Sequence, residues 1–114
     1  MVDKITLNEL RQRLEANPAL VLVEALPEQH YRHSHIPRAI NLSHDEVDVR
    51  APELLPDKDA EIVVYCASAT CQNSGIAANR LATLGYTNVR DYHEGKAEWI
   101  DAGFPVEGEA RAAA

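Results

Sequence analysis

Two short apolar runs, at residues 19–23 and 62–65, limit the folds open to this chain more than any other feature. Apart from the Tyr65 hydroxyl, neither run contains a polar side-chain atom. A strand that is apolar without interruption is typical of a sheet covered on both faces, as parallel sheets are. Weaker strand patterns occur at residues 39–42 and 88–92, and helical patterns separate all four. This alternation predicts an α/β domain built on a parallel sheet.

The helical segments between these runs are marked by capping residues and apolar spacing. A capping-box pattern at residues 6–9 predicts a helix over residues 7–16. A second such pattern, at residues 43–46, predicts the start of a brief helix, and Pro52 and Pro56 predict a loop after it. Further helices are expected at residues 28–33, from about residue 77 to 84, and at residues 94–102.

Length and charge exclude several functional classes. The 114-residue length fits one domain, expected over residues 1–107 with a loose tail at residues 108–114. The net charge of −7, without a basic stripe, argues against nucleic acid or an anionic membrane as partner. No apolar run approaches the roughly 20 residues of a membrane span, and the first residues lack a signal-peptide pattern. We therefore expect a cytoplasmic protein whose two cysteines are reactive or buried rather than joined in a structural disulfide.

Cys66 is the strongest candidate for chemistry because it directly follows the run at residues 62–65. Ligands of parallel sheets bind beyond the carboxyl ends of the strands. A helix is expected to begin within two or three residues of Cys71, so its N-terminus and the N–H groups of the loop should lower the pKa of Cys66. The hydroxyls of Ser68 and Thr70 can add donors. The pattern alone also fits an unreactive, buried cysteine.

Four motifs in order along the chain resemble one known family. Residues 34–41, Ser-His-Ile-Pro-Arg-Ala-Ile-Asn, are similar to a Gly-His-Ile-Pro-Gly-Ala-Ile-Asn motif. Residues 64–66, Val-Tyr-Cys, resemble the strand that leads into an active-site cysteine. Gly95 with Trp99, followed by Ala-Gly-Phe-Pro-Val at residues 102–106, resembles the closing pattern, and residues 4–10 resemble the opening one. The chain thus resembles a rhodanese homology domain from residue 4 to 107.

The resemblance implies a five-stranded parallel sheet flanked by helices, and sulfur transfer as the activity. Cys66 would accept a sulfane sulfur from thiosulfate or another donor as a persulfide, and pass it to a thiol or another nucleophile. The partners would be a small sulfur-donor anion, or a protein or low-molecular-weight thiol, and no metal or organic cofactor is required. The loop around the sulfur would consist of Ala67, Ser68, Ala69, Thr70 and Cys71.

Three departures from the family pattern concern positive charge. Cys71 stands where the loop often ends in arginine. Glu24 and Leu26 replace an Asp-x-Arg pair, which removes a guanidinium that commonly ties loops together. Ser34 and Arg38 replace the two glycines around His-Ile-Pro, and Arg38 could restore positive charge near the loop.

The residues also leave other functions open. Cys71 is either a small residue near a helix start or a resolving thiol that forms a disulfide with Cys66, which requires their Cα atoms to lie within about 7 Å. The chain could therefore be a dithiol redox protein, or a non-catalytic binding module that uses the same loop. Phosphatase chemistry is disfavoured because position 72 is glutamine rather than arginine. We expect the histidines to be solvated rather than metal ligands; they are His30, His33, His35, His44 and His93.

Overall fold

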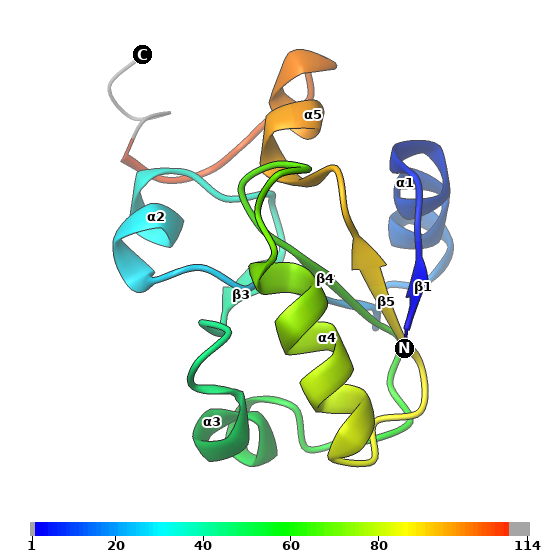
Figure 1. The fold of residues 1–114 in the computed structure, drawn as a ribbon. Helices are drawn as coiled ribbons and strands as arrows, with labels where there is room; N and C mark the ends of the chain where they lie inside the picture. The colour runs from blue at the N-terminus through cyan, green and yellow to red at the C-terminus, as the bar shows by residue number, and fades with distance from the viewer. Residues whose placement is uncertain (1, 110–114) are drawn as a thin grey trace.

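The computed structural model describes residues 2–109 and has an α/β fold with five parallel strands in the order β1-β5-β4-β2-β3 (Figure 1). This confirms the predicted fold class. The strands are β1 (Asp3–Lys4), β2 (Val21–Glu24), β3 (Ala39–Asn41), β4 (Ile62–Tyr65) and β5 (Val89–Tyr92). The helices are α1 (Leu7–Ala16), α2 (Glu28–His33), α3 (Val47–Leu54), α4 (Asn73–Thr83) and α5 (Gly95–Asp101).

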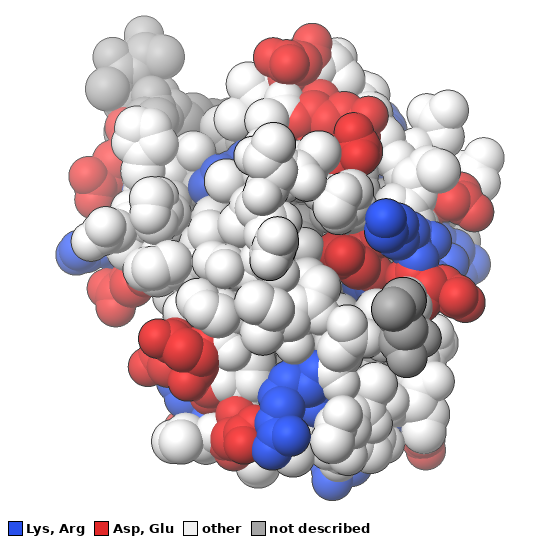
Figure 2. Space-filling model, viewed as in Figure 1, with Lys and Arg blue, Asp and Glu red and all other residues white. Residues whose placement is uncertain are grey.

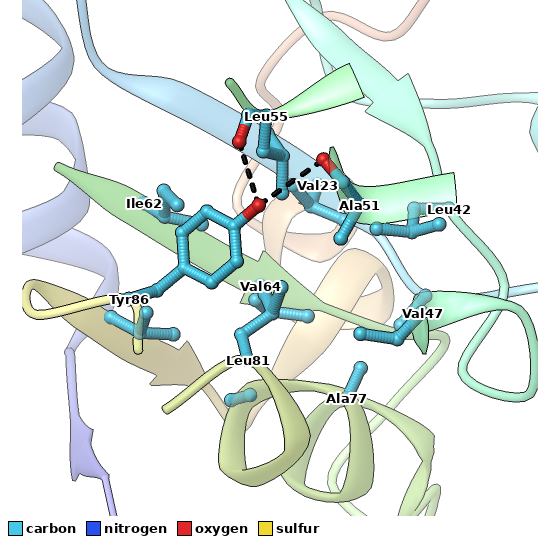
Figure 3. Close-up of a cluster of buried hydrophobic side chains, with 13 residues drawn as sticks. Val23, Leu42, Val47, Ala51, Leu55, Ile62, Val64, Ala77, Leu81 and Tyr86 are labelled. Carbon is cyan, nitrogen blue, oxygen red and sulfur yellow. Dashed lines mark hydrogen bonds between the residues drawn. The ribbon is translucent and has the colours of Figure 1, made fainter. Parts of the chain in front are cut away.

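The uninterrupted apolar pattern of β4 follows from its central place in the sheet. β4 pairs with β2 on one side and β5 on the other, and all four of its residues are buried. Successive side chains of a strand point to opposite faces. Ile62 and Val64 therefore join a cluster with α3 and α4 (Figure 3), while Val63 and Tyr65 join one with α1 and α5. Helices on both faces explain why an alternating pattern is absent.

The capping box predicted at Ser43 is wrong, and so is the loop predicted at Pro52. The Ser43 hydroxyl donates to the Asp45 carboxylate at 2.8 Å, α3 begins at Val47, and Pro52 lies inside that helix. A proline inside a helix costs about 3 kcal/mol. Tertiary contacts offset this cost, because the Tyr86 hydroxyl lies 3.2 Å and 2.6 Å from the carbonyl oxygens of Ala51 and Leu55 (Figure 3).

Arg38 does not supply positive charge to the Cys66 loop, the role considered for it from the sequence. Its guanidinium instead donates to four carbonyl oxygens at the end of α1 and in the following turn, at 2.8–3.2 Å; these belong to Leu14, Asn17, Pro18 and Leu20. The backbone of Arg38 has a φ of 77°, in the left-handed region that favours glycine. The position thus keeps the glycine-like conformation of the family motif and uses the side chain as a cap for α1.

We expect Arg38→Ala to destabilise the domain by about 1–2 kcal/mol, because the four carbonyl oxygens lose their donor while the strained φ remains. Arg38→Gly loses the same hydrogen bonds but relieves the strain. Its free energy of unfolding should therefore be about 1 kcal/mol higher than that of Arg38→Ala. Urea denaturation of the two variants measures this difference. Equal stabilities would contradict the strain argument.

The end of the described chain packs back onto the domain. Glu107 forms an antiparallel bridge with His35, and a Cβ on Gly108 would come within 2.8 Å of the Arg32 carbonyl oxygen. Residues 110–114 of the expected loose tail lie outside the described residues, so the boundary after residue 107 stays a prediction. None of the helices found between residues 2 and 109 combines the length and the apolar character needed to cross a membrane.

Candidate functional site

Cys66 lies at the carboxyl edge of the sheet, directly after the central strand β4, as its sequence position predicted. Residues 67–72 form a short loop, and α4 begins at Asn73. The loop and the start of α4 lie in front of the sheet edge (Figure 1). The structure therefore brings all the residues expected around the sulfur, from Ala67 to Cys71, into one turn between β4 and α4.

The Cys66 sulfur lies beneath this loop, and the residue is fully buried. It lies 3.4 Å from the Cys71 carbonyl oxygen, 3.5 Å from the Ser74 hydroxyl and 3.9 Å from the Ser68 carbonyl oxygen. Burial raises the pKa of the Cys66 thiol and the neighbouring Cys71 thiol raises it further, while the hydroxyl and amide of Ser74 act in the opposite direction. The low pKa expected from the sequence is therefore wrong for the resting loop, because burial and carbonyl acceptors favour the protonated thiol.

Three consecutive amides of the loop have no backbone acceptor. The Cys71 amide donates to the Ser68 carbonyl oxygen at 3.0 Å. Within the described part of the chain, the amides of Ser68, Ala69 and Thr70 donate to no backbone carbonyl. The hydroxyls of Ser68 and Thr70 lie 3.0 Å apart and bind each other rather than the sulfur. Amides without a backbone acceptor are the kind of donor that backbone anion-binding nests use.

The base of the loop is held by the first residues of α5. The amides of Lys96 and Ala97 donate to the carbonyl oxygens of Cys66 and Ala67 at 2.9 Å and 2.8 Å. Gly95 has a φ of +74°, and a Cβ there would come within 2.6 Å of the Cys66 carbonyl oxygen. Only glycine lets the backbone of α5 approach the cysteine this closely, which gives the closing glycine motif a physical role.

A buried charged cluster lies beneath the same loop and was missed by sequence reasoning. The carboxylate of Glu24 is fully buried and accepts from the Tyr65 hydroxyl at 2.7 Å. The Lys96 ammonium lies 3.3 Å from both Glu24 oxygens and donates to the Ser34 carbonyl oxygen at 2.6 Å. Tyr65 also accepts from the Ile36 amide at 3.0 Å. Lys96 thus connects α5 with Glu24 at the end of β2 and with the Ser34 backbone. The sequence offers no local signal for this pairing, because Lys96 and Glu24 lie 72 positions apart.

Two of the histidines contact residues other than those of the Cys66 loop. His35 stacks on Tyr31 at 3.8 Å between ring centroids, and its Nδ1 lies 2.8 Å from the Tyr31 carbonyl oxygen. His93 lies 4.0 Å from the Asp91 carboxylate. No group of three histidine, cysteine, aspartate or glutamate side chains among residues 2–109 is arranged to hold a metal ion.

Comparison with known proteins places this arrangement in a family. A model of the rhodanese-like domain matches residues 6–102. The chain belongs to the rhodanese-like domain family. Among solved structures, the rhodanese-like domain of the Alr3790 protein from Anabaena sp. superposes with a TM-score of 0.84 at 27% identity, covering 100% of this chain and 85% of that one. The family resemblance in the sequence is therefore confirmed.

Two curated relatives match this chain over only part of their own length. The HTH-type transcriptional regulator Rv0324 from Mycobacterium tuberculosis is 39% identical over 105 residues, which cover 92% of this chain and 45% of that protein. The thiosulfate sulfurtransferase PspE from Escherichia coli is 38% identical over 66 residues, covering 58% of this chain and 61% of PspE. This chain thus spans less than two thirds of the length of either relative.

Proposed function

We propose that this rhodanese-like domain is a sulfurtransferase that carries sulfane sulfur as a persulfide on Cys66. The observation that carries the proposal is the position of Cys66 at the end of β4, enclosed by a loop in which three consecutive amides have no backbone acceptor. The family membership and the activity named for PspE support it. The donor is thiosulfate or another sulfane-sulfur compound, and the acceptor is a thiol or another nucleophile.

The reaction has two half-steps that need only the chain's own groups. The Cys66 thiolate attacks the outer sulfur of the donor, a Cys66–sulfur bond forms, and sulfite or a thiolate leaves. The acceptor then attacks the outer persulfide sulfur and returns the electron pair of that bond to Cys66. The free amides of Ser68, Ala69 and Thr70 can hold the anionic donor and the terminal sulfur of the persulfide.

The protonated resting thiol implies a rate that rises with pH. Because burial raises the pKa of Cys66 above its ordinary value, only a small fraction is thiolate near neutral pH. The rate of sulfur uptake from thiosulfate should therefore increase about tenfold per pH unit from neutrality up to the usual thiol range. Stopped incubations read by intact mass, at constant ionic strength, measure the slope. A rate independent of pH above 7 would mean that Cys66 is already ionised.

The loop lacks a cation to attract thiosulfate, a dianion. Residues 66–74 contain no lysine or arginine, and Figure 2 shows a largely uncharged surface over the loop and the start of α4. Lys96 is buried and paired with Glu24. Cys71→Arg should therefore lower the KM for thiosulfate about tenfold relative to Cys71→Ser, since a charge-assisted contact contributes about 1.4 kcal/mol. The comparison with Cys71→Ser separates the added charge from the lost thiol, and equal KM values would contradict the expectation.

The test of the proposed function is an intact mass spectrum after brief incubation with thiosulfate. We expect one added sulfur atom in the unaltered chain and in Cys71→Ser, and none in Cys66→Ser. Absence of added sulfur from both Cys66-containing proteins would overturn the proposal for thiosulfate. If mild oxidant then removed two hydrogens, a dithiol redox function would be favoured. If neither change occurred, a non-catalytic binding module would be the better interpretation.

A further inference from the structure

We propose that Cys71 resolves the Cys66 persulfide: its thiol displaces the carried sulfur as hydrosulfide and leaves a Cys66–Cys71 disulfide. The inference rests on the proposed function and deepens it. It gives the domain a second way to unload sulfur that needs no acceptor at the loop. It is carried by the contact between the Cys71 backbone and the Cys66 sulfur inside one loop.

The backbone of Cys71 lies directly over the Cys66 sulfur. The turn closed by the hydrogen bond from the Cys71 amide to the Ser68 carbonyl oxygen, 3.0 Å long, folds Cys71 back toward β4. The Cys71 carbonyl oxygen consequently lies 3.4 Å from the Cys66 sulfur. Since a carbonyl oxygen and the Cα of its residue are about 2.4 Å apart, the Cys71 Cα lies within roughly 6 Å of that sulfur. A thiol on this Cα can reach Cys66 with a local adjustment of the turn.

The contact between the two cysteines runs through the Cys71 backbone carbonyl, and the Cys71 side chain adds to the raised pKa of the Cys66 thiol. Both cysteines are free, so neither thiol is engaged in another covalent bond. Attack within one loop replaces a bimolecular encounter, which gives Cys71 a large advantage over thiols from solution.

Burial separates the roles of the two cysteines. Cys66 is fully buried, whereas Cys71 is half-buried at the rim of the loop. A thiol from solution therefore has poor access to the inner sulfur of a Cys66 persulfide, whereas the Cys71 thiol is close enough to reach it. A disulfide between the two would in turn expose the Cys71 sulfur to an external reductant.

The step balances without an added oxidant. The Cys71 sulfur attacks the Cys66 sulfur, the bond between the Cys66 sulfur and the carried sulfur breaks, and hydrosulfide leaves with the electron pair. The Cys71 thiol proton goes to solvent or to the departing sulfur. The carried sulfur is reduced and the Cys71 thiol is oxidised. A dithiol, or two monothiols, must then reduce the disulfide before another cycle.

Attack at the outer sulfur is the competing course, and it would move the persulfide onto Cys71. In that course the leaving group is the Cys66 thiolate. Burial raises the pKa of Cys66, and a thiol of higher pKa leaves more slowly. Leaving-group chemistry therefore favours release of hydrosulfide over migration of the persulfide.

The experiment loads Cys66 chemically, so that it does not depend on activity toward thiosulfate. The full chain, Cys71→Ser and Cys71→Ala are treated briefly with sodium tetrasulfide, desalted, and followed by intact mass and with a hydrosulfide electrode. We expect the unaltered chain to release hydrosulfide and end two hydrogens lighter than its reduced form, with the disulfide mapped to residues 66–71. Both variants should hold the added sulfur at least tenfold longer.

Several outcomes would overturn the inference while leaving the proposed function standing. One is equal persistence of the added sulfur in the unaltered chain and both variants, and another is a stable persulfide mapped to Cys71. Failure of tetrasulfide to load Cys66 in any of the proteins would instead overturn the inference together with the proposed function, because the buried sulfur would then be unreactive. A parallel incubation with thiosulfate tests the proposed function separately: uptake by Cys71→Ser supports sulfur transfer whatever the fate of the resolving step.

Discussion

Replacing Lys96 with methionine is expected to destabilise the domain by about 3–5 kcal/mol. The change leaves the fully buried Glu24 carboxylate without its cation and the Ser34 carbonyl oxygen without its donor. Removing one member of a buried ion pair costs far more than the pair contributes as a whole, because an uncompensated charge stays out of water. The measurement is the free energy of unfolding in urea by circular dichroism, with the slope checked against the unaltered chain.

Two controls separate burial of charge from loss of a lysine. Lys58→Met removes an exposed ammonium that donates to the Leu84 carbonyl oxygen at 2.9 Å, and should cost less than about 1 kcal/mol. The double variant Glu24→Gln with Lys96→Met removes both charges, so part of the lost stability should return. If Lys96→Met is no less stable than Lys58→Met, Lys96 does not hold the segments together.

Gly95→Ala is expected to lower the rate of sulfur uptake by Cys66 about 100-fold. The new Cβ would meet the Cys66 carbonyl oxygen at 2.6 Å and the Ser68 amide nitrogen at 2.9 Å, so the base of the loop must move. Displacement of a reacting group by about 1 Å is enough to cost on the order of 100-fold in rate. The measurement is the initial rate of persulfide formation with thiosulfate, read by intact mass.

Gly103→Ala is the matched control for this variant. Gly103 also has a positive φ, +84°, but a Cβ there would meet nothing within 4 Å. Its replacement should therefore cost only the backbone strain, about 1 kcal/mol of stability, and leave the uptake rate within a factor of two. Equal loss of uptake in both variants would show that Gly95 acts through general stability and not through the position of Cys66.

Lys96 and Arg38 show why the electrostatics of the site could not be predicted from sequence. The family pattern pointed to a missing guanidinium at Leu26 and a possible replacement at Arg38. The structure assigns Arg38 to the end of α1 and brings Lys96 to Glu24, 72 positions away along the chain. Which charged side chains pair depends on how the loops cross the edge of the sheet, and no local sequence pattern predicts the path of those loops.

The region around α3 shows the same limit in secondary structure. Ser43 carries a good capping signal and Pro52 a strong breaking signal, yet the helix begins at Val47 and contains Pro52. Tertiary burial of Val47 and Ala51, together with the Tyr86 hydroxyl, outweighs the local preferences. By contrast, the capping box at Thr6 and Glu9 agrees with the structure, because all its contacts are local.

The sequence by itself determined the α/β fold, the buried strand at residues 62–65 and the position of Cys66 at its end, because apolar patterning and the end of a buried strand are local properties. Only the tertiary structure decided the state of the thiol, which lies under the Cys71 carbonyl oxygen with a raised pKa instead of ionised above a helix N-terminus. It also decided that Gly95 and Lys96 form the base of the loop. Burial and charge pairing depend on segments distant in sequence, and the free energies that they contribute appear only when the chain has folded.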